Sequence, residues 1–138
     1  MKITVIDASN YFKGLLLLIR KDHKITDMEI QVMKRIGKTL GFEPKFCDNA
    51  INEILKNKYI EDTAPEFTTK EIAMKFIKDG LALASSDVEV HHNEQKWLKA
   101  TAEKNGLDIN WFYREKEIAA NRKQLPSHME VDDLIVEY

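Results

Sequence analysis

Residues 22–42 read DHKITDMEIQVMKRIGKTLGF, and residues 87–107 read DVEVHHNEQKWLKATAEKNGL. Both stretches open on an aspartate, pass through a β-branched residue and a glutamate, and end on a glycine followed by a hydrophobic residue. The matching positions are 65 residues apart: Asp22 with Asp87, Ile25 with Val90, Glu29 with Glu94, Gly41 with Gly106, and Phe42 with Leu107. A pattern that returns at a fixed offset predicts one supersecondary unit used twice.

The repeat extends upstream into an apolar segment of each copy. There Tyr11 corresponds to Phe76, Phe12 to Ile77, Lys13 to Lys78, and Leu16 to Leu81. The repeated units are therefore residues 11–42 and 76–107, joined by residues 43–75. A single helix–loop–helix cannot bury its own apolar face, whereas two copies can pack against each other. The repeat predicts a pseudo-two-fold arrangement of two helix–loop–helix units.

Helical periodicity dominates the chain, and strand-like alternation occurs only in residues 2–6. Capping boxes, in which a hydroxyl residue precedes a glutamate by three positions, begin at Thr26 and Thr68. Gly41 and Gly106 are typical helix stops. The expected helices begin near Asp7 or Ser9 and cover residues 7–20, 26–40, 44–55, 68–85, 92–105 and 109–123.

A third capping box lies at Ser127–Glu130, after Pro126 has broken the chain. The apolar residues beyond it have the i, i+3, i+4, i+7 spacing of an amphipathic helix. They are Val131, Leu134, Ile135 and Tyr138. We expect one helical domain over residues 1–125 and an acidic amphipathic helix over residues 126–138, docked on this domain or in a groove of a partner protein. The fold class is all-α, a bundle of about six or seven helices.

The composition narrows the classes of function. The 138 residues include 21 Lys and Arg and 23 Asp and Glu, and the net charge of −2 argues against a nucleic-acid-binding protein. The aliphatic run at residues 15–19 is far shorter than the roughly 20 residues of a membrane helix, and it fits a buried central helix. Cys47 is the single cysteine, which fits a reducing compartment. We expect a cytoplasmic protein that does not insert into a membrane.

The doubled pattern resembles the TerB-like family, the helical domains of tellurite-resistance proteins and of some membrane-anchored co-chaperones. The residues that carry the resemblance are Asp22, Ile25, Glu29 and Leu40-Gly41-Phe42, then Asp87, Val90, Glu94 and Asn105-Gly106-Leu107. The likeness covers most of residues 7–125, and it implies a role in stress response or regulation and acidic interhelical loops that bind metal. Two departures are His23 and Val88, which stand where the family usually has glycine. Valine fits a left-handed backbone conformation poorly.

The metal hypothesis concerns four carboxylates: Asp22, Glu29, Asp87 and Glu94. Ca²⁺, Mg²⁺ or Mn²⁺ would suit this all-oxygen set if the two loops converge. The competing interpretation is structural, because Glu29 is the third residue of a capping box and loop aspartates commonly form Asx turns. Zinc fits less well, since His91 and His92 are neighbours that point about 100° apart on a helix and no local set supplies further ligands.

The sequence contains no recognisable catalytic machinery. It lacks a glycine-rich phosphate loop and a nucleophile elbow. Cys47, in a helical segment, is more typical of a small buried residue than of a nucleophile. We expect a non-enzymatic scaffold that binds a protein partner and, in one interpretation, a divalent metal through its acidic loops. The alternative is a metal-independent adaptor that uses the C-terminal helix or the groove between the repeats.

Overall fold

The computed structural model describes residues 1–21, 25–57, 59–85, 92–122 and 124–138, and the statements below concern those residues. The elements follow in the order β1 (Lys2–Thr4), α1 (Val5–Arg20), α2 (Asp27–Thr39), α3 (Pro44–Lys56), α4 (Lys70–Ser85), α5 (His92–Lys104), α6 (Ile109–Arg122), η1 (Glu130–Asp133) and β2 (Ile135–Glu137). Six α-helices and two strands of three residues each make this an all-α helical bundle, as the sequence predicts.

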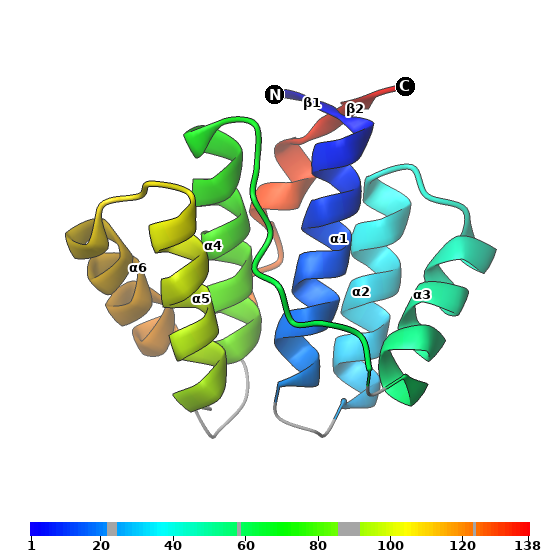
Figure 1. Cartoon of the computed structure of the whole chain (residues 1–138), viewed down its shortest axis with the longest axis horizontal. Coiled ribbons are helices and arrows are strands. Elements are labelled where there is room, and N and C mark those ends of the chain that lie inside the picture. Colours follow the sequence, from blue (N-terminus) through cyan, green and yellow to red (C-terminus); the bar gives the residue numbers. More distant parts are fainter. Residues whose placement is uncertain (22–24, 58, 86–91, 123) are drawn as a thin grey trace.

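The helices form two groups of three, and the groups meet along one helix of each (Figure 1). α1 and α4 pack side by side in the middle, with α2 and α3 beyond α1, and α5 and α6 beyond α4. The aliphatic run Leu15–Ile19 is buried, with no side chain more than 9% exposed, and the prediction of a central buried helix is confirmed. None of the helices among the described residues is long and apolar enough to cross a membrane.

The helix bounds recur at the offset of the sequence repeat. α1 and α4 each contain 16 residues, and α2 and α5 each contain 13. Both α2 and α5 are followed by a glycine in the left-handed region, Gly41 at φ 84° and Gly106 at φ 71°, which confirms the predicted helix stops. The superposition of the two halves on a two-fold axis stays a prediction. The hydrogen bonds that close these helix ends run from Phe42 N to Gly37 O at 2.9 Å and from Leu107 N to Ala102 O at 3.0 Å.

α1 begins at Val5, earlier than the predicted start near Asp7 or Ser9. The reason is that Thr4 is the N-cap, and its Oγ1 accepts a hydrogen bond from Asp7 N at 3.1 Å. The carboxylate of Asp7 is buried and accepts hydrogen bonds from the backbone N–H and the hydroxyl of Thr68. Asp7 therefore ties the start of α1 to the segment that leads into α4.

The two capping boxes predicted within the helical body have different outcomes. The box at Thr26 is confirmed, because Thr26 and Glu29 exchange hydrogen bonds between side chain and backbone. The box at Thr68 is wrong by one residue. Thr69 caps α4 instead, and its Oγ1 accepts from Ile72 N at 3.2 Å. The hydroxyl of Thr68 is engaged by the buried Asp7 carboxylate, a partner that local spacing does not reveal.

The predicted amphipathic α-helix over residues 126–138 is wrong. Glu130–Asp133 form the single-turn 3₁₀ helix η1, and Ile135–Glu137 form β2. β2 pairs in parallel with β1, so that Lys2 lies opposite Ile135. β1 is the part of the predicted alternation at residues 2–6 that adopts an extended conformation. The partner of β2 comes from the other end of the sequence, and β-branched residues such as Ile135 and Val136 suit a strand once such a partner is present.

Candidate functional site

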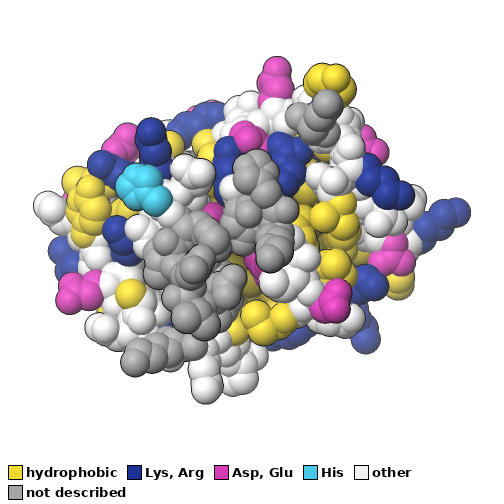
Figure 2. Space-filling model, turned by 90° about the horizontal axis from the view of Figure 1, so that it is seen from below, with side chains coloured by type: hydrophobic (Ala, Val, Ile, Leu, Met, Phe, Trp, Pro, Cys, Tyr) yellow, Lys and Arg dark blue, Asp and Glu magenta, His cyan; other side chains and the backbone are white. Residues whose placement is uncertain are grey.

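A cavity of ≈ 630 Å³ opens at the end of the bundle where α1 and α3 finish and α5 begins. Figure 2 views the molecule toward this end and shows Lys and Arg side chains beside hydrophobic ones. We call this cavity the basic pocket, because the described residues that line it include four cationic side chains and one carboxylate among apolar groups. The residues that define it below are Arg20, Lys21, Lys56, Asp62, Lys96 and Trp97.

One wall of the basic pocket is the linker between α3 and α4, which Arg20 holds in place. Its guanidinium donates from Nη1 to Asn57 O at 3.2 Å and from Nη2 to Ile60 O at 2.8 Å, and it pairs with the Asp62 carboxylate. Lys21 Nζ binds the other oxygen of Asp62 at 2.6 Å. Partial burial tends to raise the pKa of Asp62, but the hydrogen bonds from Lys21 and Arg20 outweigh it and hold that pKa below its ordinary value.

The opposite wall is one face of α5. Asn93, Lys96, Trp97 and Ala100 line the cavity at the i, i+3, i+4, i+7 spacing of a single helical face. The indole Nε1–H of Trp97 donates to Asp62 O at 2.9 Å, and the side chain is only 7% exposed. Through Asp62 the linker therefore contacts α1 and α5, which belong to different halves of the bundle.

The rim of the basic pocket carries two further cations, Lys56 at the end of α3 and Lys96 on α5. Both side chains are exposed, and among the described residues neither takes part in an ion pair. Between them the lining is apolar, with the half-buried Ile25, the exposed Ala100 and Leu55, which is 47% exposed. A lysine at the C-terminal end of a helix also interacts favourably with the helix dipole, so Lys56 stabilises α3 in addition to adding positive charge to the pocket.

The predicted metal ligands fall into two groups. Asp22 and Asp87 lie outside the described residues. Glu29 is buried and acts as a helix cap: its Oε1 accepts hydrogen bonds from Thr26 N at 3.0 Å and from Thr26 Oγ1 at 3.1 Å. Glu94 is buried at the third position of α5. No three His, Cys, Asp or Glu side chains in the described ranges form a group that could hold a metal ion, and the metal hypothesis stays a prediction.

The predicted partner-binding residues also divide into two groups. Val131 and Leu134 are buried in the core of this chain, at 0% and 4% exposure. Ile135 and Tyr138 are 60% and 78% exposed, and the Tyr138 hydroxyl donates to Leu40 O at 2.8 Å. The sequence left two alternatives for the C-terminal segment, docking on this domain or in a groove of a partner protein. In the structure the segment docks on this domain.

A buried carboxylate receives the start of that C-terminal segment. Asp79 on α4 is 2% exposed and accepts hydrogen bonds from Tyr11 Oη at 2.6 Å, from Glu130 N at 2.8 Å and from Val131 N at 2.9 Å. Burial raises the pKa of Asp79 to about 6, although the three hydrogen bonds oppose the rise. Burial and the neighbouring Asp79 also raise the pKa of Tyr11 well above its ordinary value.

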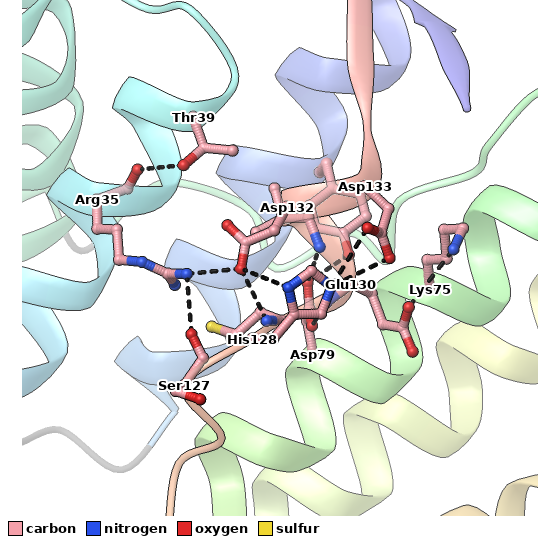
Figure 3. Close-up of polar contacts among 12 residues, drawn as sticks. Arg35, Thr39, Lys75, Asp79, Ser127, His128, Glu130, Asp132 and Asp133 are labelled. Carbon is pink, nitrogen blue, oxygen red and sulfur yellow. Dashed lines mark hydrogen bonds and ion pairs between the residues drawn. The ribbon is translucent and has the colours of Figure 1, made fainter.

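Ion pairs on the surface surround this buried contact (Figure 3). Arg35 on α2 reaches Asp132 at 2.6 Å, while Lys75 on α4 reaches Glu130 at 3.4 Å. His128 lies against Asp133 at 3.2 Å. The segment is thus held by α2 on one side and α4 on the other. We call residues 126–138, with these contacts, the C-terminal clamp.

The sequence patterns predict neither the basic pocket nor the contact of Asp79 with the C-terminal clamp. Asp79 carries a usable signal, since it is an acidic residue within a mostly apolar stretch of α4. The basic pocket has little signal in the sequence, because Arg20, Lys56 and Lys96 belong to three different helices and come together only in the folded chain.

Comparison of the chain with the models of known protein families, with curated protein sequences and with solved structures finds no match.

Proposed function

We propose that this chain is a non-enzymatic, cytoplasmic domain of the TerB-like kind that binds a segment of a partner protein in the basic pocket, in a stress-response or regulatory role. The observation that carries the proposal is the cavity of ≈ 630 Å³ between α1, α3 and α5, which apolar and cationic side chains line together. Binding sites are typically concave, of roughly 300–1,000 Å³, and largely apolar with a few polar groups that orient the ligand. The basic pocket falls within this range of volume, and it combines apolar groups with charged ones.

The C-terminal segment is a weaker candidate for the partner site. Docking of an amphipathic helix in a groove needs free apolar anchors at helical spacing. Val131 and Leu134 are already used in the core, and the segment is not an α-helix. This burial favours the basic pocket over the C-terminal segment.

An acid–base enzyme is the competing class, and Asp79 is the residue that would support it. Its pKa is raised to about 6, and it borders a small cavity of ≈ 260 Å³. A catalytic carboxylate must reach a substrate proton within about 3 Å. Asp79 is 2% exposed, and both of its oxygens accept hydrogen bonds from groups of the protein itself. This arrangement favours a structural role for Asp79.

The proposal is tested by selecting binders from a random twelve-residue peptide display library on the full-length chain. Synthetic copies of the selected peptides are then titrated against the Trp111→Phe variant, in which Trp97 is the remaining tryptophan. We expect saturable changes in Trp97 emission, because Trp97 lines the pocket.

Ala100→Tyr fills the basic pocket from the exposed face of α5 and should abolish binding, whereas Ala120→Tyr on the exposed face of α6 serves as the matched control. Failure to select any peptide that alters Trp97 emission, or unchanged binding by Ala100→Tyr, would refute the proposal.

A divalent metal in the acidic loops stays a separate proposal. The four carboxylates suggested by the TerB-like resemblance include the capping residue Glu29, and this structural use reduces its availability as a ligand. Partner binding in the basic pocket does not depend on a metal, so the two proposals can be tested separately.

A further inference from the structure

We infer that the partner segment bound in the basic pocket presents an acidic side chain next to an apolar one, with the carboxylate between Lys56 and Lys96 and the apolar group on Leu55 and Ala100. This inference rests on the proposed function and names the chemistry of its ligand. It follows from three properties of the pocket: the cations without an ion-pair partner, the apolar residues of the lining, and the way in which Asp62 is bound.

The available charge lies on the rim. Arg20 and Lys21 are both paired with Asp62, and Arg20 also donates to two carbonyl oxygens of the linker. Lys56 and Lys96 line the same cavity and, in the part of the chain that the structure describes, have no ion-pair partner. The chain carries a net charge of −2, whereas the described residues that line this pocket include four cations and one carboxylate. Charge complementarity therefore favours an anionic ligand.

The apolar residues of the lining favour an anion that also carries an apolar group. A free phosphate or a nucleic-acid backbone would leave Leu55, Ile25 and Ala100 unused, and nucleic-acid binders carry an extended basic surface that tracks the phosphates. A cavity of ≈ 630 Å³ accommodates side chains of a peptide. An acidic residue beside a leucine or phenylalanine could pair with the two lysines and contact the apolar residues of the lining at the same time.

Asp62 shows how a carboxylate binds in this pocket. It receives one cation at each oxygen, from Arg20 and from Lys21. A ligand carboxylate between Lys56 and Lys96 would be held in a comparable way. Because Asp62 lines the same cavity, its negative charge also opposes an acidic ligand. Neutralising Asp62 should therefore strengthen binding, whereas neutralising the rim lysines should weaken it.

The experiment titrates the strongest peptide from the library, and the same peptide with each Asp and Glu replaced by Asn and Gln, into the full-length chain. The backbone amide shifts of α5 report binding, and Trp97 emission reports it when the chain and its variants also carry Trp111→Phe. We expect the amide peptide to bind at least roughly tenfold more weakly, and the Lys56→Gln plus Lys96→Gln variant to lose roughly tenfold in affinity for the acidic peptide. Asp62→Asn should bind the acidic peptide a few-fold more tightly, and Lys38→Gln plus Lys45→Gln, on exposed positions of α2 and α3, should bind like the parent.

The outcomes separate this inference from the proposed function. Selected peptides without acidic residues, or equal binding of the acidic and amide peptides, with Ala100→Tyr still blocking both, would overturn the acidic ligand and leave the binding function standing. An increase of affinity in Asp62→Asn supports a direct electrostatic role of the pocket, because a merely structural role of Asp62 would weaken binding instead. Loss of all binding at the parent protein would overturn both proposals.

Discussion

The burial of Asp79 makes a quantitative prediction for the stability of the fold. This carboxylate lies beneath the C-terminal clamp, with Tyr11 and two backbone N–H groups as its hydrogen-bond donors. The nearest lysines of α4, Lys75 and Lys78, pair with Glu130 instead. Among the described residues no cation contacts Asp79 directly, so its ionised form is buried without an ion-pair partner in that part of the chain, which is unfavourable. Asp79→Asn removes the charge and keeps the size of the side chain.

The magnitude follows from the pKa of Asp79, which rises from 3.8 to about 6 on folding because of burial. At 1.36 kcal/mol per pH unit, this difference corresponds to about 3 kcal/mol. The native state holds the proton more tightly than the unfolded state, so the contribution is fully present below pH 3.8. It is lost as the pH rises through about 6. Of this amount, about 2 kcal/mol is lost between pH 4.5 and pH 7.5.

The assay is urea unfolding of the parent chain and of Asp79→Asn at pH 4.5, 5.5, 6.5 and 7.5. The amide that replaces the carboxyl group in the variant cannot titrate, so the difference in unfolding free energy between the two proteins should shift by about 2 kcal/mol in favour of the variant as the pH rises. The loss of one acceptor adds an offset that does not vary with pH. Taking the difference also removes most of the contribution of Asp62, whose lowered pKa acts in the opposite direction. A difference that stays constant across these pH values would refute the reasoning.

Three further predictions concern packing and metal binding. Gly37→Ala should destabilise the fold by about 1–3 kcal/mol in urea unfolding, because a Cβ at this position would lie 2.3 Å from Cys47 Sγ, and an unchanged midpoint would contradict the close packing of α2 on α3. Val131→Ala should cost about 2 kcal/mol because the side chain is fully buried, and a cost near zero would contradict the docking of the C-terminal clamp. The metal hypothesis predicts that Ca²⁺, Mg²⁺, Mn²⁺ or Zn²⁺, at a hundredfold excess over its Kd, stabilises EDTA-treated protein by about 2.7 kcal/mol, and that Asp22→Asn plus Asp87→Asn abolishes the shift in thermal unfolding. No shift with any of the four ions would contradict the metal hypothesis.

Local signals in the sequence were sufficient for most of the helices. The hydroxyl N-cap at Thr26 and the glycines after α2 and α5 act within a single turn, and the structure has helix ends at those places. The start of α4 was misplaced by one residue because the hydroxyl of Thr68 binds Asp7, which lies 61 positions earlier in the chain. Local patterns predict a helix end well when the capping group has no competing partner elsewhere.

The C-terminal segment shows the opposite case. Its spacing of apolar residues suits a helix, but long-range contacts determine its conformation, among them the strand partner β1, the carboxylate of Asp79, and the ion pairs to Arg35 and Lys75. Backbone pairing with β1 and capping of η1 by Asp79 satisfy the N–H groups that an α-helix would have satisfied internally. Such compensation depends on residues far away in the sequence, so a periodicity within residues 126–138 could not predict it.

The basic pocket was beyond sequence reasoning for a related reason, and this has a functional consequence. Its walls come from α1, α3, α5 and the linker, and hydrogen bonds from Arg20 to Asn57 O and Ile60 O and from Trp97 to Asp62 O hold the linker by its backbone. The linker thus bridges the two halves of the bundle at one wall of the pocket. A ligand that pairs with the rim lysines contacts both α3 and α5, and it would stabilise the same arrangement of the halves. Under the proposed function, partner binding and the joining of the two halves would consequently be coupled.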